Sequence, residues 1–275
     1  ELGRCPESEQ SFREALEIRE EVLGPDHLDV ASTLSAYATM LNTGPRRPLD
    51  AIPMFERALA IARAELGEER RATVAGILYG LANAQAYALR FDVAEATSLE
   101  LLELYRDMYG PEHESVARTL HSLSILAKNA DDIEGALDYA YRCRDVHDAV
   151  LPEGHPDRAF NLDVIARCYI DSDRHDEAEE VLRRALELRR TGLSPDHVHT
   201  TESEALLAMC LIEREAFEEA EPLLLHALEV CRATYPPGHP QQSYVLARVQ
   251  NLYRLWGRTD EADEYLGLYR EAGGR

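Results

Sequence analysis

The sequence is poor in lysine and has no excess of positive charge. Lys128 is its only lysine, and its 29 basic residues stand against 51 acidic ones, which gives a formal net charge of −22. A protein that binds nucleic acid gains affinity by releasing phosphate counterions from a basic surface, so this charge balance argues against nucleic acid as a partner. An acidic surface instead attracts basic partners over long range. The preference for arginine over lysine is typical of a GC-rich genome, and we expect a bacterial source.

Long apolar runs are also missing. No stretch approaches the ~20 consecutive apolar residues of a membrane-spanning helix. The start, Glu1-Leu2-Gly3-Arg4, has neither an initiator methionine nor the basic and apolar segments of a signal peptide. We therefore expect no membrane partner, and we interpret the sequence as part of a longer soluble protein.

Cysteines are few and widely spaced, and none forms a CxxC pair. In a chain of 275 residues, five such cysteines do not predict a disulfide framework. They are Cys5, Cys143, Cys168, Cys210 and Cys231. We expect reduced thiols packed in the core, which favours a cytoplasmic location.

Motifs of catalytic and cofactor sites are absent. The sequence has no Gly-rich phosphate loop, no GxSxG elbow and no GxGxxG turn. The run from His113 to Ala117 begins like a zinc-protease motif but lacks the second histidine. His197 and His199 have no Cys or carboxylate pattern nearby that would complete a metal site. We predict a protein with no enzymatic activity, no cofactor and no metal.

What the sequence does contain is an internal repeat. A loop of the kind Gly24-Pro25-Asp26-His27 recurs, and Leu66-Gly67-Glu68-Glu69-Arg70 fills the second place with Arg70 at the histidine position. These positions are 27, 70, 113, 155, 197 and 239, which lie 43, 43, 42, 42 and 42 residues apart. Alanines recur at 51, 94, 136, 178, 220 and 262. A fixed period indicates a repeat architecture. Since the five histidines occupy equivalent loops, we expect each to hydrogen-bond backbone in its own loop.

The segments between the loops have helical spacing of apolar residues. Leu162, Ile165, Ala166 and Tyr169, for example, fall on one helical face. Glycine and proline in the loops fit helix ends, so each repeat is predicted as helix A, a short turn and helix B. The predicted elements are a lone helix at 6–23 and hairpins at 29–67, 71–110, 114–151, 157–193, 199–234 and 241–272, thirteen helices in all. We expect a single array over 1–275, an all-α solenoid in which each unit contacts its neighbours.

The repeat resembles a known family. The recurring alanine followed four residues later by a large residue, as at Phe55 and Tyr139, resembles the second helix of tetratricopeptide repeats. The 42-residue period and the GPDH-like loop resemble the kinesin-light-chain type. The resemblance implies a right-handed α-α superhelix that binds a partner segment in its concave face. The segment 251–269 also resembles the tail of arrays that follow bacterial Ser/Thr kinase domains.

The family's groove positions, transferred residue by residue, give a candidate peptide-binding groove. It comprises Tyr79, Asn83, Tyr87, Arg118, His121, Lys128, Asn129, Phe160, Arg167, Tyr244, Arg248, Asn251 and Arg254, together with Asp163, Asp171, Glu202, Met209 and Glu213. Asn83 and Asn251 match a position where an amide grips a ligand's backbone. The two-carboxylate clamp of chaperone-binding relatives is not matched, because Ile125, Arg167 and Met209 stand there. For Tyr79 and Tyr87, packing between repeats is the alternative.

These expectations favour a protein-interaction scaffold, and we expect it to be the regulatory or substrate-recruiting arm of a larger bacterial signalling protein. We expect the region of Arg118 and Arg167 to contact an acidic or C-terminal stretch of the partner, because guanidinium groups bind carboxylates in pairs of hydrogen bonds. The alternative is a self-assembly module that associates through its terminal repeats. The expected oligomeric state is a monomer, or weak self-association of that kind.

Overall fold

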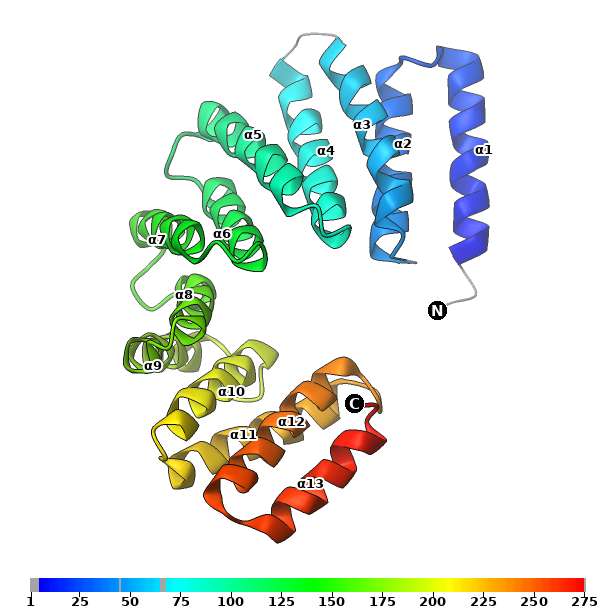
Figure 1. Cartoon of the computed structure of the whole chain (residues 1–275). Coiled ribbons are helices and arrows are strands. Elements are labelled where there is room, and N and C mark those ends of the chain that lie inside the picture. The colour runs from blue at the N-terminus through cyan, green and yellow to red at the C-terminus, as the bar shows by residue number, and fades with distance from the viewer. Residues whose placement is uncertain (1–4, 45, 65–67, 275) are drawn as a thin grey trace. The chain divides into compact units, whose positions relative to one another are not determined.

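The regular structure of the chain is entirely helical over the residues that the computed structural model describes, 5–44, 46–64 and 68–274. The side chains of residues 5, 6, 68 and 69 are not described, and Glu1-Leu2-Gly3-Arg4, Leu66 and Gly67 lie outside the described residues. The elements are α1 (Cys5–Leu23), α2 (Leu28–Thr43), α3 (Pro48–Ala64), α4 (Glu68–Tyr87), α5 (Phe91–Tyr109), α6 (Glu114–Asn129), α7 (Ile133–Val150), η1 (Pro156–Ala159), α8 (Phe160–Asp171), α9 (His175–Gly192), α10 (Val198–Glu213), α11 (Phe217–Thr234), α12 (Pro240–Trp256) and α13 (Thr259–Glu271), as Figure 1 shows. The all-α class and the thirteen α-helices of the described chain are confirmed.

The helices pack mainly on their neighbours in sequence. The pairs α2 and α3, α4 and α5, α8 and α9, α10 and α11, and α12 and α13 lie side by side (Figure 1). The chain divides into two compact units, Glu1–Val146 and His147–Arg275, here called unit 1 and unit 2. Each is a stack of helical hairpins. Among the helices that the structure describes, none is long and apolar enough to cross a membrane.

Small residues fill the crossings between helices A and B. The repeat alanines Ala51, Ala94, Ala136, Ala178 and Ala220 are fully buried, which lets the helix axes approach closely. Cysteines also occupy core positions, and Cys143, Cys168, Cys210 and Cys231 are buried free thiols. The thiol of Cys143 on α7 lies 2.9 Å from the carbonyl oxygen of Ala117 on α6. The prediction of packed thiols is confirmed for these four.

The histidines of the recurring loop are N-caps. In each case Nδ1 accepts a hydrogen bond from the backbone N–H two residues later, at 3.1–3.2 Å, and this holds for His27, His113, His155, His197 and His239. Such a bond satisfies one of the N–H groups that a helix leaves without a partner at its start. The predicted backbone role is therefore confirmed. Arg70 differs, because α4 begins at Glu68 and places it inside the helix.

The turns from helix A to helix B share a left-handed residue that the repeat analysis did not identify. Positive φ values occur at Arg46, Leu89, Asp131, Asp173, Glu215 and Gly257. In five of these turns the next residue donates its N–H to a carbonyl five positions earlier, as Asp132 does to Ala127 at 2.9 Å, and in the first turn Arg47 donates to Leu41, six positions earlier. This bond closes the helix end in the manner of a Schellman motif. Only one of the six turns uses glycine for the left-handed position.

Candidate functional site

A pocket of about 300 Å³ lies between α4, α5 and α6 in unit 1. It is lined by Tyr79, Ala82, Asn83, Ala86, Tyr87, Ser98, Leu101, Thr119, Ser122, Ile125, Leu126 and Asn129. Tyr79, Asn83 and Tyr87 share a wall because residues four apart lie on one face of a helix. The structure therefore brings together four of the predicted groove residues, the fourth being Asn129 at the end of α6.

The aromatic wall of this pocket is only partly covered by the protein. Tyr79 is 46% exposed and Tyr87 is 65% exposed, and Ile125 on the opposite wall is also exposed. Packing between helices therefore leaves about half of each tyrosine open to solvent. Exposed tyrosines beside an apolar floor are the kind of residue that contributes most to binding at protein interfaces.

The pocket also holds two amides with unused hydrogen-bonding capacity. The side-chain amides of Asn83 and Asn129 form no hydrogen bond with any described part of the chain. An amide side chain offers both donor and acceptor atoms, which is what the backbone of an extended peptide requires. The pocket therefore combines apolar contact area with two groups that can bind a backbone.

The other predicted residues of α6 do not line the pocket. Arg118 is exposed. Burial raises the pKa of the Tyr105 hydroxyl, and the positive charge of Arg118 opposes that shift. His121 and Lys128 are half-buried and engaged with other groups of the chain. Arg118 belongs to unit 1 and Arg167 to unit 2, so the joint contact that the sequence suggested for them stays a prediction.

In unit 2 the predicted residues lie on α8, α10 and α12. Phe160 begins α8, and its ring meets His199 edge-on with the centroids 5.1 Å apart. Asn251 on α12 is not free as the resemblance implied, because its Oδ1 accepts a hydrogen bond from Arg254 at 2.6 Å. The side-chain N–H groups of Asn251 remain as possible donors to a ligand.

Arg248 lies flat against a tyrosine ring. Its guanidinium carbon is 3.2 Å from the centroid of the Tyr244 ring, and Nη1 donates to the Tyr244 carbonyl oxygen at 3.0 Å. Nε lies 3.1 Å from Sδ of Met209 on α10. These contacts hold the guanidinium plane in one orientation. Arg167 on α8 and Tyr244 also line a small pocket of about 20 Å³.

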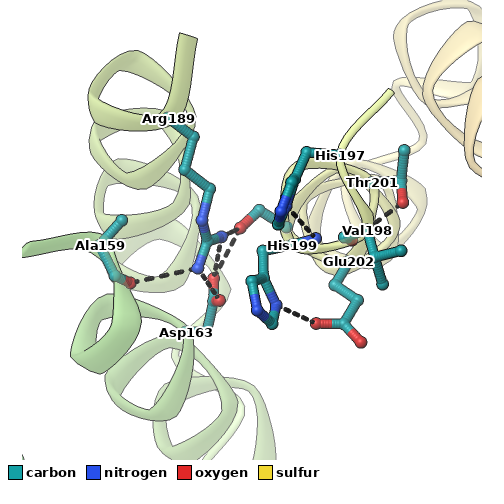
Figure 2. Close-up of polar contacts among 9 residues, drawn as sticks. Ala159, Asp163, Arg189, His197, Val198, His199, Thr201 and Glu202 are labelled. Atoms are coloured by element: carbon teal, nitrogen blue, oxygen red, sulfur yellow. Dashed lines mark hydrogen bonds and ion pairs between the residues drawn. The ribbon is translucent and has the colours of Figure 1, made fainter. Parts of the chain in front are cut away.

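Asp163, expected in the groove, is used inside the protein instead. Figure 2 shows Arg189 of α9 reaching across to Asp163 of α8. Nη2 and Nη1 of Arg189 lie 2.5 and 3.1 Å from the two carboxylate oxygens, and Oγ of Ser203 on α10 donates to Asp163 at 2.6 Å. Arg189 is only 1% exposed. This buried ion pair joins three helices and leaves Asp163 unavailable to a ligand.

Several pocket residues were not predicted from the sequence. Ser122 and Ile125 line the pocket two turns and one turn before Asn129, and Ala86 lies one turn after Asn83. These residues lie three or four positions from predicted ones, and this helical spacing is the sequence feature that could have identified them. Ser98 and Leu101 come from a helix B, which the family's groove positions do not include.

Two of the buried thiols have raised pKa values. Burial raises the pKa of the Cys210 thiol to about 11, and burial also raises that of Cys231, so both are protonated near neutral pH. No three His, Cys, Asp or Glu side chains within the described ranges are arranged so that they could hold a metal ion.

Comparison with known proteins places these features in a family. The tetratricopeptide repeat family model matches residues 1–64, 126–191 and 198–272. Protein KINESIN LIGHT CHAIN-RELATED 1 of Arabidopsis thaliana is 24% identical over 202 residues, covering 71% of this chain and 32% of the relative. This chain thus spans about a third of that protein's length.

Solved structures share the fold. BtubC (BKLC) from P. vanneervenii superposes with a TM-score of 0.67 at 19% identity, over 86% of this chain and 93% of that chain. A Rap protein complexed with competence and sporulation factor superposes with a TM-score of 0.64 at 15% identity, over 98% of this chain and 74% of that chain.

Proposed function

Because this chain belongs to the tetratricopeptide repeat family, of the kinesin-light-chain-like type, we propose that it is a scaffold that binds an extended segment of a partner protein. The pocket between α4, α5 and α6 receives an apolar side chain of that segment. The observation that carries the proposal is the pairing of half-exposed Tyr79 and Tyr87 with the uncommitted amides of Asn83 and Asn129 around one cavity. The tyrosines supply contact area, and the amides bind the segment's backbone.

The volume of the pocket fits one or two side chains of a peptide. At about 300 Å³ it lies at the lower end of the range for small-molecule sites. It is also open, as the exposure of both tyrosines requires. A segment that continues along α4 and α6 past the pocket is therefore the ligand that best matches this site.

Selection from a random peptide library displayed on phage tests the proposal, followed by fluorescence anisotropy with the selected peptides. Tyr79→Ala should weaken binding by about 30-fold, the effect of losing a contact worth about 2 kcal/mol. Asn83→Ala should weaken it by about fivefold, because one net hydrogen bond contributes about 1 kcal/mol. Tyr109→Ala is the matched control, since Tyr109 is 47% exposed and lies outside the pocket. Selected peptides that bind all three variants like the wild type would rule out this pocket.

The proposed setting is the cytoplasmic regulatory arm of a bacterial signalling protein. It rests on the resemblance of the segment 251–269 to arrays that follow bacterial kinase domains. Sequencing the full reading frame tests it, and an adjacent kinase domain is the expected result. A frame without any signalling domain contradicts this setting but leaves peptide binding untouched.

Self-assembly is a second candidate, favoured by one observation. Ile18, Val22 and Leu23 on α1 are exposed apolar side chains. If copies associate through this face, Ile18→Glu with Val22→Glu should convert oligomers to monomers in multi-angle light scattering. A wild-type chain that stays monomeric across the concentration range excludes this alternative.

A further inference from the structure

A second hollow of unit 1 lies where two turns from helix A to helix B meet, and we call it the turn pocket. Its volume is about 390 Å³. One side comes from the turn before α3 and the start of that helix, and the other from the end of α4 and the turn after it. Both turns lie at the same end of their helices (Figure 1). The wall includes Arg46, Arg47, Leu49, Asp50, Tyr87 and Leu89.

The apolar side chains of the turn pocket are unusually exposed. Leu49 is 62% exposed, Tyr87 65% and Leu89 73%. All three are among the five most exposed large apolar side chains of the described residues. Apolar residues that gather on an open surface mark a place where another molecule covers them. The turn pocket therefore has the composition of a binding surface.

Leu89 stands out further because its backbone conformation is unfavourable for leucine. Its φ of 58° lies in the left-handed region, which large side chains adopt only rarely. Equivalent turns have Asp131, Asp173 and Gly257, whose residue types tolerate this region. Leu89 thus combines backbone strain with exposure to solvent, and neither stabilises the fold. A strained residue of this kind points to a functional role.

The proline inside α3 adds a hydrogen-bond acceptor at the turn pocket. Pro53 has no N–H, so the carbonyl oxygen of Leu49, four residues earlier, lacks its usual helical donor. A backbone N–H of a bound segment can supply this hydrogen bond. The turn pocket thus offers apolar contact area together with a backbone acceptor.

The charges around the turn pocket disfavour a basic side chain. Arg47 lies 2.6 Å from Asp50 and 3.1 Å from Glu9. Arg46 is exposed and forms no ion pair within the described residues. The wall is therefore locally positive in a chain whose formal net charge is −22. The acidic surface as a whole attracts cations, but this pocket repels them and suits an uncharged apolar side chain.

Tyr87 connects the turn pocket with the pocket between α4, α5 and α6, because it lines both. We propose that the turn pocket binds a second apolar side chain of the same partner segment whose first apolar residue occupies the pocket between α4, α5 and α6. The inference rests on the proposed function and extends the path of the segment over the end of α4. The partner segment thus carries two uncharged apolar residues, one on each side of Tyr87.

Peptides selected on the complete wild-type chain from a random phage-displayed library are the probes, labelled with fluorescein and measured by anisotropy. Leu89→Asn should weaken their binding by about tenfold, the effect of losing one apolar side-chain contact. Asparagine tolerates the left-handed region, so this variant should unfold at the same denaturant concentration as the wild type or at a higher one. A purely structural role for Leu89 predicts the reverse, a loss of stability with unchanged binding. Leu49→Ala should also weaken binding, by about fivefold, and provides a second test.

Leu255→Asn is the matched control, because it makes the same change at a 44% exposed leucine of unit 2 that lies outside both pockets. It should leave binding unchanged. An alanine scan of each peptide then locates the residue that contacts Leu89. Alanine at that position should weaken binding to the wild type by about tenfold but to Leu89→Asn by less than about twofold, because the contact is already lost.

Other outcomes overturn the proposal in distinguishable ways. Peptides that bind Leu89→Asn and Leu49→Ala like the wild type, but are weakened by Tyr79→Ala, reject the turn pocket and leave the proposed function standing. Peptides weakened by Leu89→Asn but not by Tyr79→Ala reject a single segment across both pockets. Equal weakening by Leu255→Asn assigns the effect to general apolar adhesion. If the library yields no binding peptide, the proposed function fails and this inference fails with it.

Discussion

A single buried arginine joins three helices of unit 2. Arg189 links α9 to Asp163 on α8 and to Ser203 on α10, and it does so in near-complete burial. Removing one partner of a buried pair leaves the other charge without compensation, which is far more destabilising than losing an exposed pair. Helix α9 carries an exposed ion pair as well as the buried one: Arg184 and Glu187 are exposed and 2.5 Å apart.

Arg189→Ala should therefore lower the free energy of unfolding by about 3–5 kcal/mol. Arg184→Ala is the control and should change it by less than about 1 kcal/mol, as exposed pairs do. Urea titration followed by circular dichroism measures both. Similar small losses of stability in the two variants would contradict a stabilising role for the Arg189–Asp163 pair.

His226 makes the stability of unit 2 depend on pH. Its two ring nitrogens lie 2.7 Å from Glu204 and 3.1 Å from Asp196. Burial lowers the pKa of His226, but hydrogen bonds to the two carboxylates and their charges outweigh it, so the net pKa is raised above 6.5. A group whose pKa is higher in the folded than in the unfolded protein stabilises the fold at pH values below its unfolded-state pKa. This stabilisation is lost as the pH rises through the folded-state pKa.

His226→Gln should therefore destabilise the protein more at acidic than at alkaline pH. The difference in unfolding free energy between wild type and variant should be largest below about pH 6.5 and should shrink as the pH rises through the folded-state pKa. Chemical denaturation at a series of pH values measures it. If the difference in unfolding free energy between wild type and variant stays constant with pH, the stabilising interaction of protonated His226 with Glu204 and Asp196 is contradicted.

At the scale of elements, the histidine caps are one of two devices that set helix boundaries. His113 accepts a bond from the Ser115 N–H, and its ring also stacks on Tyr109 with centroids 4.4 Å apart. His113→Ala should lower the unfolding free energy by about 1 kcal/mol, whereas His113→Asn keeps a capping acceptor and should lose much less. Thermal melts of the two variants decide between the roles. Equal losses would assign the stabilisation to ring stacking.

The left-handed turns are the second device, and they differ in how well their residue suits the backbone. Gly257 adopts φ +80° with nothing within 4 Å of an added Cβ, so Gly257→Ala tests backbone strain alone. It should destabilise by about 1 kcal/mol, because a left-handed residue with a side chain costs about 1–2 kcal/mol.

Leu89 is the converse case, a highly exposed leucine at φ 58° in the equivalent turn. Leu89→Gly should stabilise by up to about 1 kcal/mol, since relief of strain exceeds the entropy that glycine adds to the unfolded chain. Denaturant midpoints measure the change. A large loss of stability would show that the Leu89 side chain contributes packing that its exposure does not indicate.

The repeat period explains which elements could be predicted from the sequence. Histidine caps and buried alanines have the same structural role in every repeat. The same residue type therefore recurs at the same position, and the sequence shows the repeat directly. The left-handed turns recur as regularly in structure, but the residue that occupies the left-handed position varies, from Leu89 to Asp131 and Asp173 to Glu215. Backbone strain leaves no signature when the residue that bears it varies.

The site was predictable where it depends on one helix and not where it depends on several. Tyr79, Asn83 and Tyr87 meet because they share a face of α4, which spacing alone predicts. The ion pair of Asp163 with Arg189 joins two helices, and the small cavity that Arg167 and Tyr244 line also lies between different helices. They depend on side-chain reach and helix packing, which a linear pattern does not contain.

At the scale of the whole molecule, each unit offers its own chemistry. Unit 1 has an open, partly aromatic pocket with two asparagine amides on its wall, and in unit 2 the buried ion pair of Arg189 and Asp163 joins neighbouring helices.

The most direct test of the peptide-binding proposal is hydrogen–deuterium exchange on the complete chain with and without a library-selected peptide. Amides of α4 and α6 next to Tyr79, Asn83 and Asn129 should exchange more slowly when the peptide is bound, and Tyr79→Ala should remove that protection. Protection confined to other helices, with α4 and α6 unchanged, would contradict the account.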